Sequence, residues 1–355
     1  MSRALSFDDY TVAWIAVLPI EAEAAIYART HNTTAISNAS AAALGSHIKA
    51  RFPNLWFALL VGIAAGLPNL SPTDPSRHRD IRLGDVLVCV PNKRETGIIA
   101  YDQGRETDEG FFLDGRQVDT PAIVRAAISN IKLTKPSPFR SGTAFSIYLR
   151  ELQAQCSKFG YPRTKQDLLF DGKPGRGRIM QRDPWRTPKT QVWYGSIGSG
   201  NSLMRDARRR NHLRDTYDLI GLEMEAAGIM SILPTGVIRG VCDYGDAYKN
   251  KDWQPYAAAT AAAYAKGLLY TINLKRDKES ETAPPETIQY RYGGVELESG
   301  TATTTYSQDD PIASAPRNST AGWEQISLDE SNSAADCFRL KYLAGKPIRS
   351  MEDLL

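Results

Sequence analysis

The chain has 355 residues, of which 42% are hydrophobic and 23% are charged, as is ordinary for a globular protein. This length is enough for one large domain or two modest ones. The formal net charge of +3 is small for the length, which argues against a dedicated nucleic-acid-binding protein.

The first ten residues lack an apolar core, so no signal peptide is predicted. No run approaches the roughly 18 apolar residues of a membrane span. The 4 cysteines include no close pair, which disfavours a disulfide framework or a paired-cysteine metal site. Reduced thiols fit a cytosolic or nuclear setting. We therefore predict a cytoplasmic protein with no membrane and no nucleic-acid partner.

Residues 10–18 form an apolar run rich in β-branched and aromatic side chains, which predicts a strand buried on both faces. Pro19 ends this run, and a helix is expected to open with Glu21 in its first turn. Glu21 would then lie at the carboxyl end of a strand, where ligands bind in open α/β sheets. The plain alternative is an acidic residue that favours a helix N-terminus.

An alanine-rich helix is expected over 39–50, followed by a second strand at 55–61. Gly62 and the small residues up to Pro68 come directly after this strand, and such residues permit a tight turn or the close approach of a ligand. The segment lacks the spacing of a dinucleotide-binding or P-loop motif, so it is a weak phosphate signature.

The middle of the chain alternates between predicted strands and predicted helices. Strands are predicted at 86–90, 98–102 and 192–197, and helices at 121–131, 146–156 and through 204–208. The polar stretch 156–189 is expected to be a long loop. We interpret the basic run Arg208–Arg210 as a solvated helix face rather than an anion site.

An apolar run passes into helix-forming residues at Gly221–Ala227, where Glu223 and Glu225 flank Met224. In an extended segment the two carboxylates point to one side, and methionine offers a polarizable surface for a sugar or a ring. Acidic residues at the start of a helix are the alternative. The next apolar run ends in Asp243, again at the end of a predicted strand.

A strong helix former at 257–269 closes the first domain, which is predicted over 8–273. Residues 274–336 are rich in Thr, Ser, Glu, Pro and Gly and are predicted to be a disordered linker. The last segment, 337–355, regains apolar residues and is expected to form a short helix. The alternation of strands and helices predicts an α/β domain.

Six ordered segments carry a resemblance, which is more specific than any one motif. They are 10–24, 59–69, 80–88, 194–207, 221–230 and 237–269, and they include YTVAWIAVLPIEAEA and GLEMEAAGIM. With these segments the chain resembles the purine nucleoside phosphorylase/uridine phosphorylase superfamily, including methylthioadenosine nucleosidases. It looks most like the fungal nucleoside-phosphorylase-like domains of immune-receptor-type proteins. The resemblance implies an α/β, phosphorylase/hydrolase-like three-layer fold with a central twisted, partly barrel-like mixed β-sheet flanked by helices.

The resemblance also implies cleavage of an N-glycosidic bond. Asp243 matches the general acid that protonates the base at N7, Glu225 matches the carboxylate that binds the ribose hydroxyls, and Met224 matches the residue packed against the ribose. Leu203 and Met204 fall where the family lines the base pocket. The implied substrate-binding residues are Glu225, Met224, Glu223, Leu203, Met204, Ile63 and Gly62.

The group that attacks C1′ separates two interpretations. Where phosphorylases hold phosphate with arginines and a serine, this chain has Ala24, Leu60 and Ile63, which cannot bind a dianion. Glu21 matches the water-activating glutamate of nucleosidases, and Arg239 matches an arginine of their active sites. The pattern favours a purine ribonucleoside hydrolase that acts on adenosine, or on inosine and guanosine, with a phosphate-dependent phosphorylase as the alternative.

A third interpretation is a non-catalytic domain that binds a nucleoside or regulates a partner. Family members usually have another strand and a hairpin before the segment that resembles His31–Ile36, and here only a few residues precede it. The retained Glu21, Glu225, Arg239 and Asp243 speak against this interpretation.

No metal or organic cofactor is expected, because the 4 histidines are scattered without ligand spacing. Analogy with the family suggests a homo-oligomer, most simply a dimer.

Overall fold

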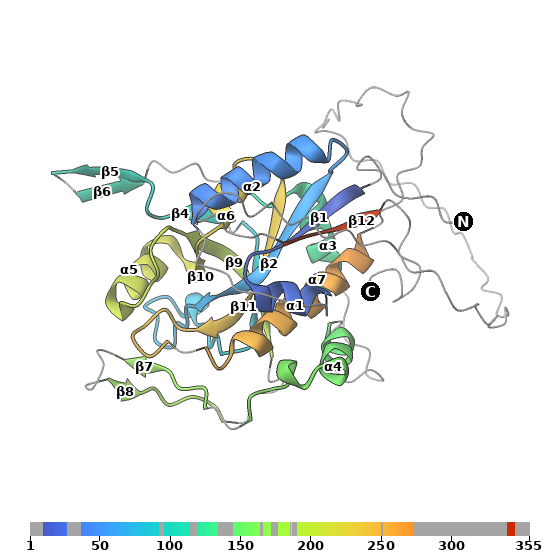
Figure 1. Ribbon diagram of the computed structural model, residues 1–355. Helices are drawn as coiled ribbons and strands as arrows, with labels where there is room; N and C mark the ends of the chain where they lie inside the picture. The colour runs from blue at the N-terminus through green and yellow to red at the C-terminus, as the bar shows by residue number, and fades with distance from the viewer. Residues whose placement is uncertain are drawn as a thin grey trace, which may run out of the picture.

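A computed structural model gives the structure of the protein. It describes residues 10–26, 37–91, 96–108, 110–113, 119–133, 145–163, 166–171, 177–184, 186, 190–249, 251–272 and 339–344. These residues form a central mixed sheet flanked by helices (Figure 1), which confirms the predicted α/β fold class. The predicted linker at 274–336 and the segment His31–Ile36 lie outside the described residues.

The central sheet has eight strands. They are β1 (Tyr10–Ala16), β2 (Phe57–Gly66), β3 (Val86–Cys89), β4 (Ile98–Ala100), β9 (Val192–Ser199), β10 (Leu219–Glu223), β11 (Thr235–Asp243) and β12 (Arg339–Ala344). Their order across the sheet is β10-β9-β3-β11-β2-β1-β12, and β4 pairs with β9. The strands β1, β2 and β11 are parallel neighbours, so their carboxyl ends meet at one edge.

Strand β10 pairs with β9 and also, antiparallel, with β2, through Gly221 opposite Gly66 and Leu222 opposite Ala65. The strands β10, β9, β3, β11 and β2 therefore form a closed ring of hydrogen-bonded neighbours. Glycine allows this closure, because a Cβ at Gly221 would lie 3.0 Å from the carbonyl oxygen of Ala65 and would clash with Leu87.

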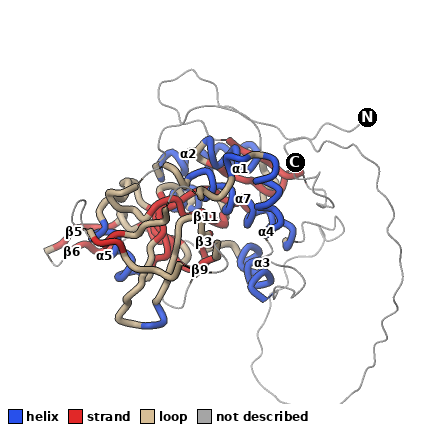
Figure 2. The backbone as a smooth tube through the Cα atoms, turned by 90° about the horizontal axis from the view of Figure 1, so that it is seen from below, coloured by secondary structure: helices blue, strands red, loops and turns tan. Residues whose placement is uncertain are grey.

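Helices cover both faces of the sheet. They are α1 (Pro19–Ile26), α2 (Asn38–Arg51), α3 (Ala122–Leu133), α4 (Ser146–Gln155), α5 (Ala207–Tyr217), α6 (Ala226–Met230) and α7 (Gln254–Thr271). The alanine-rich α7 packs on β2 and β11, and α1, α3 and α4 pack against it, whereas α2 packs on α6. Figure 2 shows α1, α4 and α7 grouped beside the sheet. In the part of the chain that the structure describes, no helix is long and apolar enough to cross a membrane.

The stretch 156–189, which we predicted to be a loop, contains more structure than expected. It holds the short helix η3 (Ser157–Phe159) and a hairpin of β7 (Phe170–Asp171) and β8 (Arg178–Ile179). Arg182 pairs with Asp80 at 2.7 Å, and Arg186 pairs with the buried Asp85 at 2.7 Å. These ion pairs fasten the stretch to the segment before β3. A second short helix, η2 (Pro75–Arg77), and a hairpin of β5 (Gly104–Thr107) and β6 (Gly110–Leu113) were also not predicted.

The helix predicted in 337–355 is wrong for its described part. Arg339–Ala344 forms the strand β12, which pairs antiparallel with the outer side of β1. Without β12, the backbone N–H and C=O groups on that side of β1 would face away from the sheet. Pairing with a strand satisfies them, which an added helix would not do.

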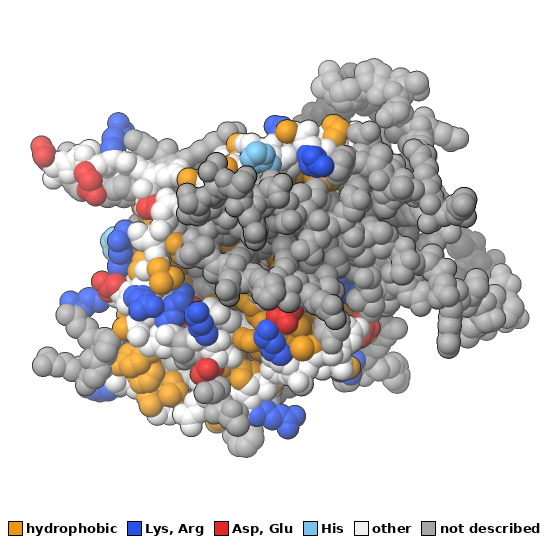
Figure 3. Space-filling model, viewed as in Figure 1, with side chains coloured by type: hydrophobic (Ala, Val, Ile, Leu, Met, Phe, Trp, Pro, Cys, Tyr) orange, Lys and Arg blue, Asp and Glu red, His pale blue; other side chains and the backbone are white. Residues whose placement is uncertain are grey.

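The interpretation of Arg208–Arg210 as a solvated face holds for two of the three residues. Basic side chains gather over α5 in Figure 3, and Arg208 and Arg209 are exposed. Arg210 is only 4% exposed. Its Nη1 donates to the carbonyl oxygen of Tyr244 at 2.7 Å and lies 3.7 Å from Asp246. One turn of α5 therefore exposes two of its arginines to solvent and buries the third against the segment 244–246.

Candidate active site

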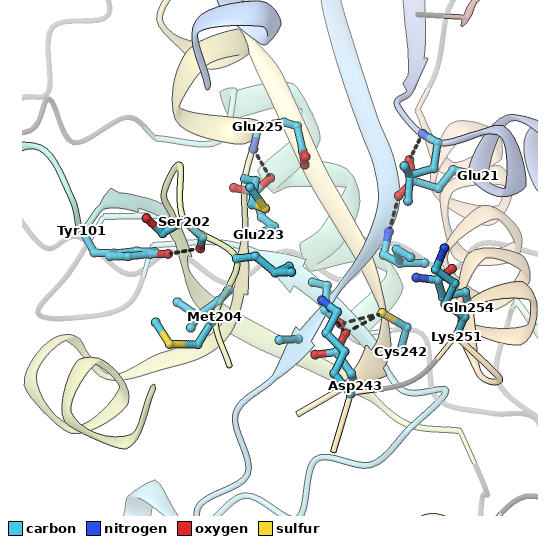
Figure 4. Close-up of a pocket in the computed structure, with 18 residues that line it drawn as sticks. Glu21, Tyr101, Ser202, Met204, Glu223, Glu225, Cys242, Asp243, Lys251 and Gln254 are labelled. Carbon is cyan, nitrogen blue, oxygen red and sulfur yellow. Dashed lines mark hydrogen bonds and ion pairs between the residues drawn. The ribbon is translucent and has the colours of Figure 1, made fainter. Parts of the chain in front are cut away.

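A cavity of about 300 Å³ lies at the edge where β1, β2 and β11 end (Figure 4). Of the predicted site residues, eight line it: Glu21, Ile63, Leu203, Met204, Glu223, Met224, Glu225 and Asp243. Two predicted residues, Arg239 and Gly62, do not line it and lie behind its wall.

Glu21 is held at the start of α1 by backbone N–H groups. Its Oε2 accepts hydrogen bonds from Val17 and Leu18, each at 2.8 Å, and its Oε1 accepts one from Ile63 at 2.7 Å. Burial raises the pKa of Glu21, and Arg239 and these backbone donors oppose that rise. A carboxylate that is fixed in place and has a raised pKa is suited to take a proton from water.

Arg239 is fully buried in the middle of β11 and gathers three carboxylates. Its Nη2 lies 2.5 Å from Glu223 and 2.9 Å from Glu225, and its Nη1 lies 3.8 Å from Glu21. Burial lowers the pKa of the guanidinium, but these carboxylates more than offset that and raise it above its ordinary value. Its Nε and Nη1 lack a hydrogen-bond partner among the residues described. Arg239 therefore sets the charge and the geometry of the site from behind the cavity wall.

Gly62 makes this arrangement possible. It lies opposite Arg239 in the β2–β11 register. A Cβ at this position would clash with both the Glu21 carboxylate and the Arg239 guanidinium. Gly62 therefore contributes space for the ion pair rather than a substrate contact.

The two carboxylates at the end of β10, Glu223 within the strand and Glu225 just after it, have different surroundings. Glu223 accepts hydrogen bonds from the backbone N–H groups of Glu225 (3.1 Å) and Ala226 (2.9 Å) and from Arg239 (2.5 Å), so its oxygens are engaged by the protein. Glu225 accepts a hydrogen bond from Arg239 at 2.9 Å, and its side chain is 12% exposed. Burial raises the pKa of Glu225 to about 8, opposed by Arg239 and reinforced by Glu223 and Glu21. Of the pair, Glu225 is the one better placed to meet a ligand hydroxyl.

Asp243 ends β11 on another side of the cavity and is 4% exposed. Its Oδ1 accepts a hydrogen bond from the N–H of Gly245 at 2.8 Å, and its Oδ2 accepts one from the thiol of Cys242 at 3.2 Å. Lys249 Nζ lies 3.0 Å from the same Oδ2.

An apolar wall completes the cavity. Met204 is buried, whereas Leu203 is 49% exposed. Tyr101 lies beside them, and its hydroxyl donates to the carbonyl oxygen of Ser202 at 3.4 Å. Burial raises the pKa of Tyr101 to about 12, so the phenol stays neutral.

Sequence reasoning missed several residues of the cavity, chiefly Tyr101, Lys249, Lys251 and Gln254. The last three follow Asp243 within the motif 237–269, so their nearness to it along the chain was an available signal. Tyr101 falls inside the strand predicted at 98–102 but directly follows β4 in the structure, so its position at the end of a strand could not be read from the sequence.

The chain is 37% identical over 242 residues to a nucleotide-binding leucine-rich repeat (NLR)-like protein of Hyaloscypha variabilis. The match covers 66% of this chain but 23% of that relative. No family model matches the chain.

Among solved structures, a 5′-methylthioadenosine/S-adenosylhomocysteine nucleosidase from Neisseria meningitidis, in complex with methylthio-immucillin-A, is 16% identical. The similarity covers 73% of this chain and 98% of that one, with a TM-score of 0.45. Futalosine hydrolase of Helicobacter pylori is 12% identical over 73% of this chain and 97% of its own, with a TM-score of 0.44.

Five of the six segments that carry the resemblance contribute residues to one cavity, whereas the segment 80–88 does not line it. In its fold and in the order of its motifs, the chain resembles the nucleoside phosphorylase/nucleosidase superfamily.

Proposed function

We propose that the chain hydrolyses the N-glycosidic bond of purine ribonucleosides, either adenosine or inosine and guanosine, to free base and ribose. One observation carries the proposal: Glu21, Glu225 and Asp243 reach a single cavity from three different elements (Figure 4). These three carboxylates match the three tasks of the reaction, which are to activate water, to hold the sugar and to protonate the base.

In the proposed reaction the C1′–N9 bond breaks and its electron pair goes to the purine. Asp243 delivers a proton to N7, so the base leaves as a neutral molecule. Glu21 takes a proton from water as the water oxygen bonds to C1′. Glu225 holds the ribose hydroxyls through hydrogen bonds, and Met224 packs against the sugar.

Water is favoured over phosphate by the chemistry near Glu21. Ala24 and Leu60 are buried apolar residues, and Ile63 presents an apolar side chain to the cavity. Arg239 is surrounded by carboxylates and does not line the cavity. Among the described residues, a phosphate dianion at this end would meet acidic groups and no guanidinium that lines the cavity, which would make its burial costly.

The test is the release of product from adenosine, inosine and guanosine, followed by chromatography with and without phosphate. We expect free ribose in phosphate-free buffer, and loss of turnover in Asp243→Asn with the melting temperature retained. Ribose 1-phosphate formed only with phosphate would support the phosphorylase instead.

A folded sample that releases no base would support the non-catalytic alternative. In that case adenosine would still raise the melting temperature, because binding to the native state stabilises it. That the protein is a homo-oligomer, that it is cytoplasmic and that it needs no metal or cofactor remain predictions.

A further inference from the structure

The acid side of the cavity holds a second charged group, Lys249. Its Nζ lies 3.0 Å from Asp243 Oδ2, and the Lys249 side chain is 21% exposed. Both residues line the cavity. A lysine at the surface usually extends into solvent, whereas this one ends on the carboxylate to which the acid role is proposed.

The loop that carries Lys249 is anchored to the body of the protein. Arg210 of α5 donates to the carbonyl oxygen of Tyr244 at 2.7 Å and pairs with Asp246 at 3.7 Å. Asp246 in turn accepts the N–H of Tyr248 at 2.9 Å. At the base of the loop, the Tyr244 hydroxyl contacts Arg182 at 2.6 Å. The lysine is therefore presented by a braced loop.

Asp243 needs a proton before it can protonate a base. In the structure its Oδ1 faces a backbone N–H and its Oδ2 faces a thiol and an ammonium, which are the partners of an ionised carboxylate. An ionised carboxylate repels the N7 lone pair, so the proton has to come from a neighbouring group. Within hydrogen-bonding distance, the group that can carry and release a proton readily is the Lys249 ammonium.

We propose that Lys249 supplies, through Asp243, the proton that neutralises the leaving purine. This inference rests on the proposed hydrolysis. As the C1′–N9 bond breaks and its electron pair moves to the purine, a proton passes from Lys249 Nζ to Asp243 Oδ2, and Asp243 releases one to N7. Lys249 is left as a neutral amine and regains its proton from solvent, while Glu21 returns to solvent the proton that it took from water.

Other charged or titratable groups face this pair and bear on any pH profile. Cys242 precedes Asp243 on β11, Asp246 and Lys251 lie on the same loop, and Arg210 reaches that loop from α5. From the remaining walls of the cavity come Glu21, Glu223, Glu225 and Tyr101. Among the described residues, the cation within salt-bridge distance of Asp243 Oδ2 is Lys249, and neither Arg210 nor Lys251 forms an ion pair with this atom.

The test compares the pH–rate profiles of three variants of Lys249. In Lys249→Met, Asp243 must take its proton from solvent, so kcat at neutral pH should fall about 10²-fold or more. The pH above which activity is lost should be lower in this variant than in the wild-type protein. Lys249→Arg keeps the positive charge but cannot release a proton, so kcat should stay low. Lys249→Ala should regain activity with added methylamine, in proportion to the amine concentration.

Two matched controls separate this role from charge alone. Lys266→Met removes a lysine that pairs with Glu151 outside the cavity, and it should leave kcat unchanged. Lys251→Met removes a second positive charge from the cavity, and its alkaline limit should stay at the wild-type pH. Melting temperatures check that each variant folds.

A wild-type pH profile in Lys249→Met, or full activity in Lys249→Arg, would overturn the inference while leaving the hydrolysis intact. A higher kcat/KM in Lys249→Met would also overturn it, because the lysine would then be blocking Asp243. No base released by the wild-type protein would overturn the proposed hydrolysis itself, and the role of Lys249 with it.

Discussion

The two charged sides of the cavity are built differently. Around Arg239, three carboxylates meet one guanidinium inside the sheet, and backbone N–H groups hold Glu21 and Glu223. Around Asp243, a single carboxylate meets Lys249, which lies on a loop outside the sheet. The first side is part of the core, so changes there should affect folding as well as turnover. The second side should affect turnover with little effect on folding.

The largest effect should follow from Arg239→Met. The variant leaves Glu21, Glu223 and Glu225 buried without their shared cation. Breaking a buried ion pair in this way typically costs about 3–5 kcal/mol. Urea denaturation should show a large fall in the free energy of unfolding. Arg209→Met, on the exposed face of α5, should change it by no more than about 0.5 kcal/mol. If Arg239→Met unfolded with the same free energy as Arg209→Met, the Arg239 side of the cavity would not be part of the folding core.

Glu21→Gln should lower kcat by about 10²–10⁴-fold, because the amide cannot accept a proton from water. Glu23 is a matched control on the same helix, since its side chain pairs with Lys158 at 2.6 Å instead of lining the cavity. Glu23→Gln should keep wild-type turnover. Base release measured by chromatography compares the two variants, and similar kcat values would remove Glu21 from the proposed reaction.

Glu225 should make stability depend on pH. Its pKa is raised from 4.5 to about 8 in the folded protein, so the native state holds a proton that the unfolded chain releases. The free energy of unfolding that Glu225 contributes is therefore fully present below pH 4.5, falls as the pH rises toward about 8 and levels off above that. Glu225→Gln should flatten this slope in urea denaturation between about pH 5 and pH 8. A wild-type slope in the variant would contradict the assignment.

The smallest effects distinguish two glycines. Gly245 has a φ of 61° and its N–H donates to Asp243, so Gly245→Ala should cost about 1–2 kcal/mol of strain. Gly267 lies within α7, and a Cβ there would meet Tyr148 at an ordinary contact distance of 3.4 Å. Gly267→Ala should instead stabilise the protein by about 0.5–1 kcal/mol. Thermal melts of both variants test this difference in sign.

The central strands could be predicted because each is an apolar run that must be buried on both faces. The run at 55–61 became β2, and the helix former at 257–269 became α7. The hairpin β5–β6 escaped prediction because both strands have only 4 residues and β5 is polar and exposed along its length. Strand β12 escaped because its pairing depends on β1, which is more than 300 residues away in the sequence.

The lining of the cavity could be predicted where a residue lies at or just after the end of a strand, as for Glu21 and Asp243. It could not be predicted where a loop decides the contact. Lys249 lies in a polar stretch of the sequence, and no pattern of residues there predicts that its ammonium points toward Asp243. Arg210 differs from Arg208 and Arg209 only in the side of α5 on which it falls. For Gly62, the run of small residues indicated the close approach of a ligand or a tight turn, whereas in the structure the side chains of Glu21 and Arg239 approach it.

The pairing of β10 with both β9 and β2 has a consequence for how the cavity can change its specificity. A wall made of strands joined in a ring cannot splay open without breaking a row of hydrogen bonds, so adjustment to a ligand falls to the parts outside the ring. Those parts are the exposed Leu203 and the loop between Asp243 and Gln254. Chains that keep this ring can therefore exchange the loop and acquire a new ligand preference while the frame, and the three carboxylates around Arg239, stay as they are.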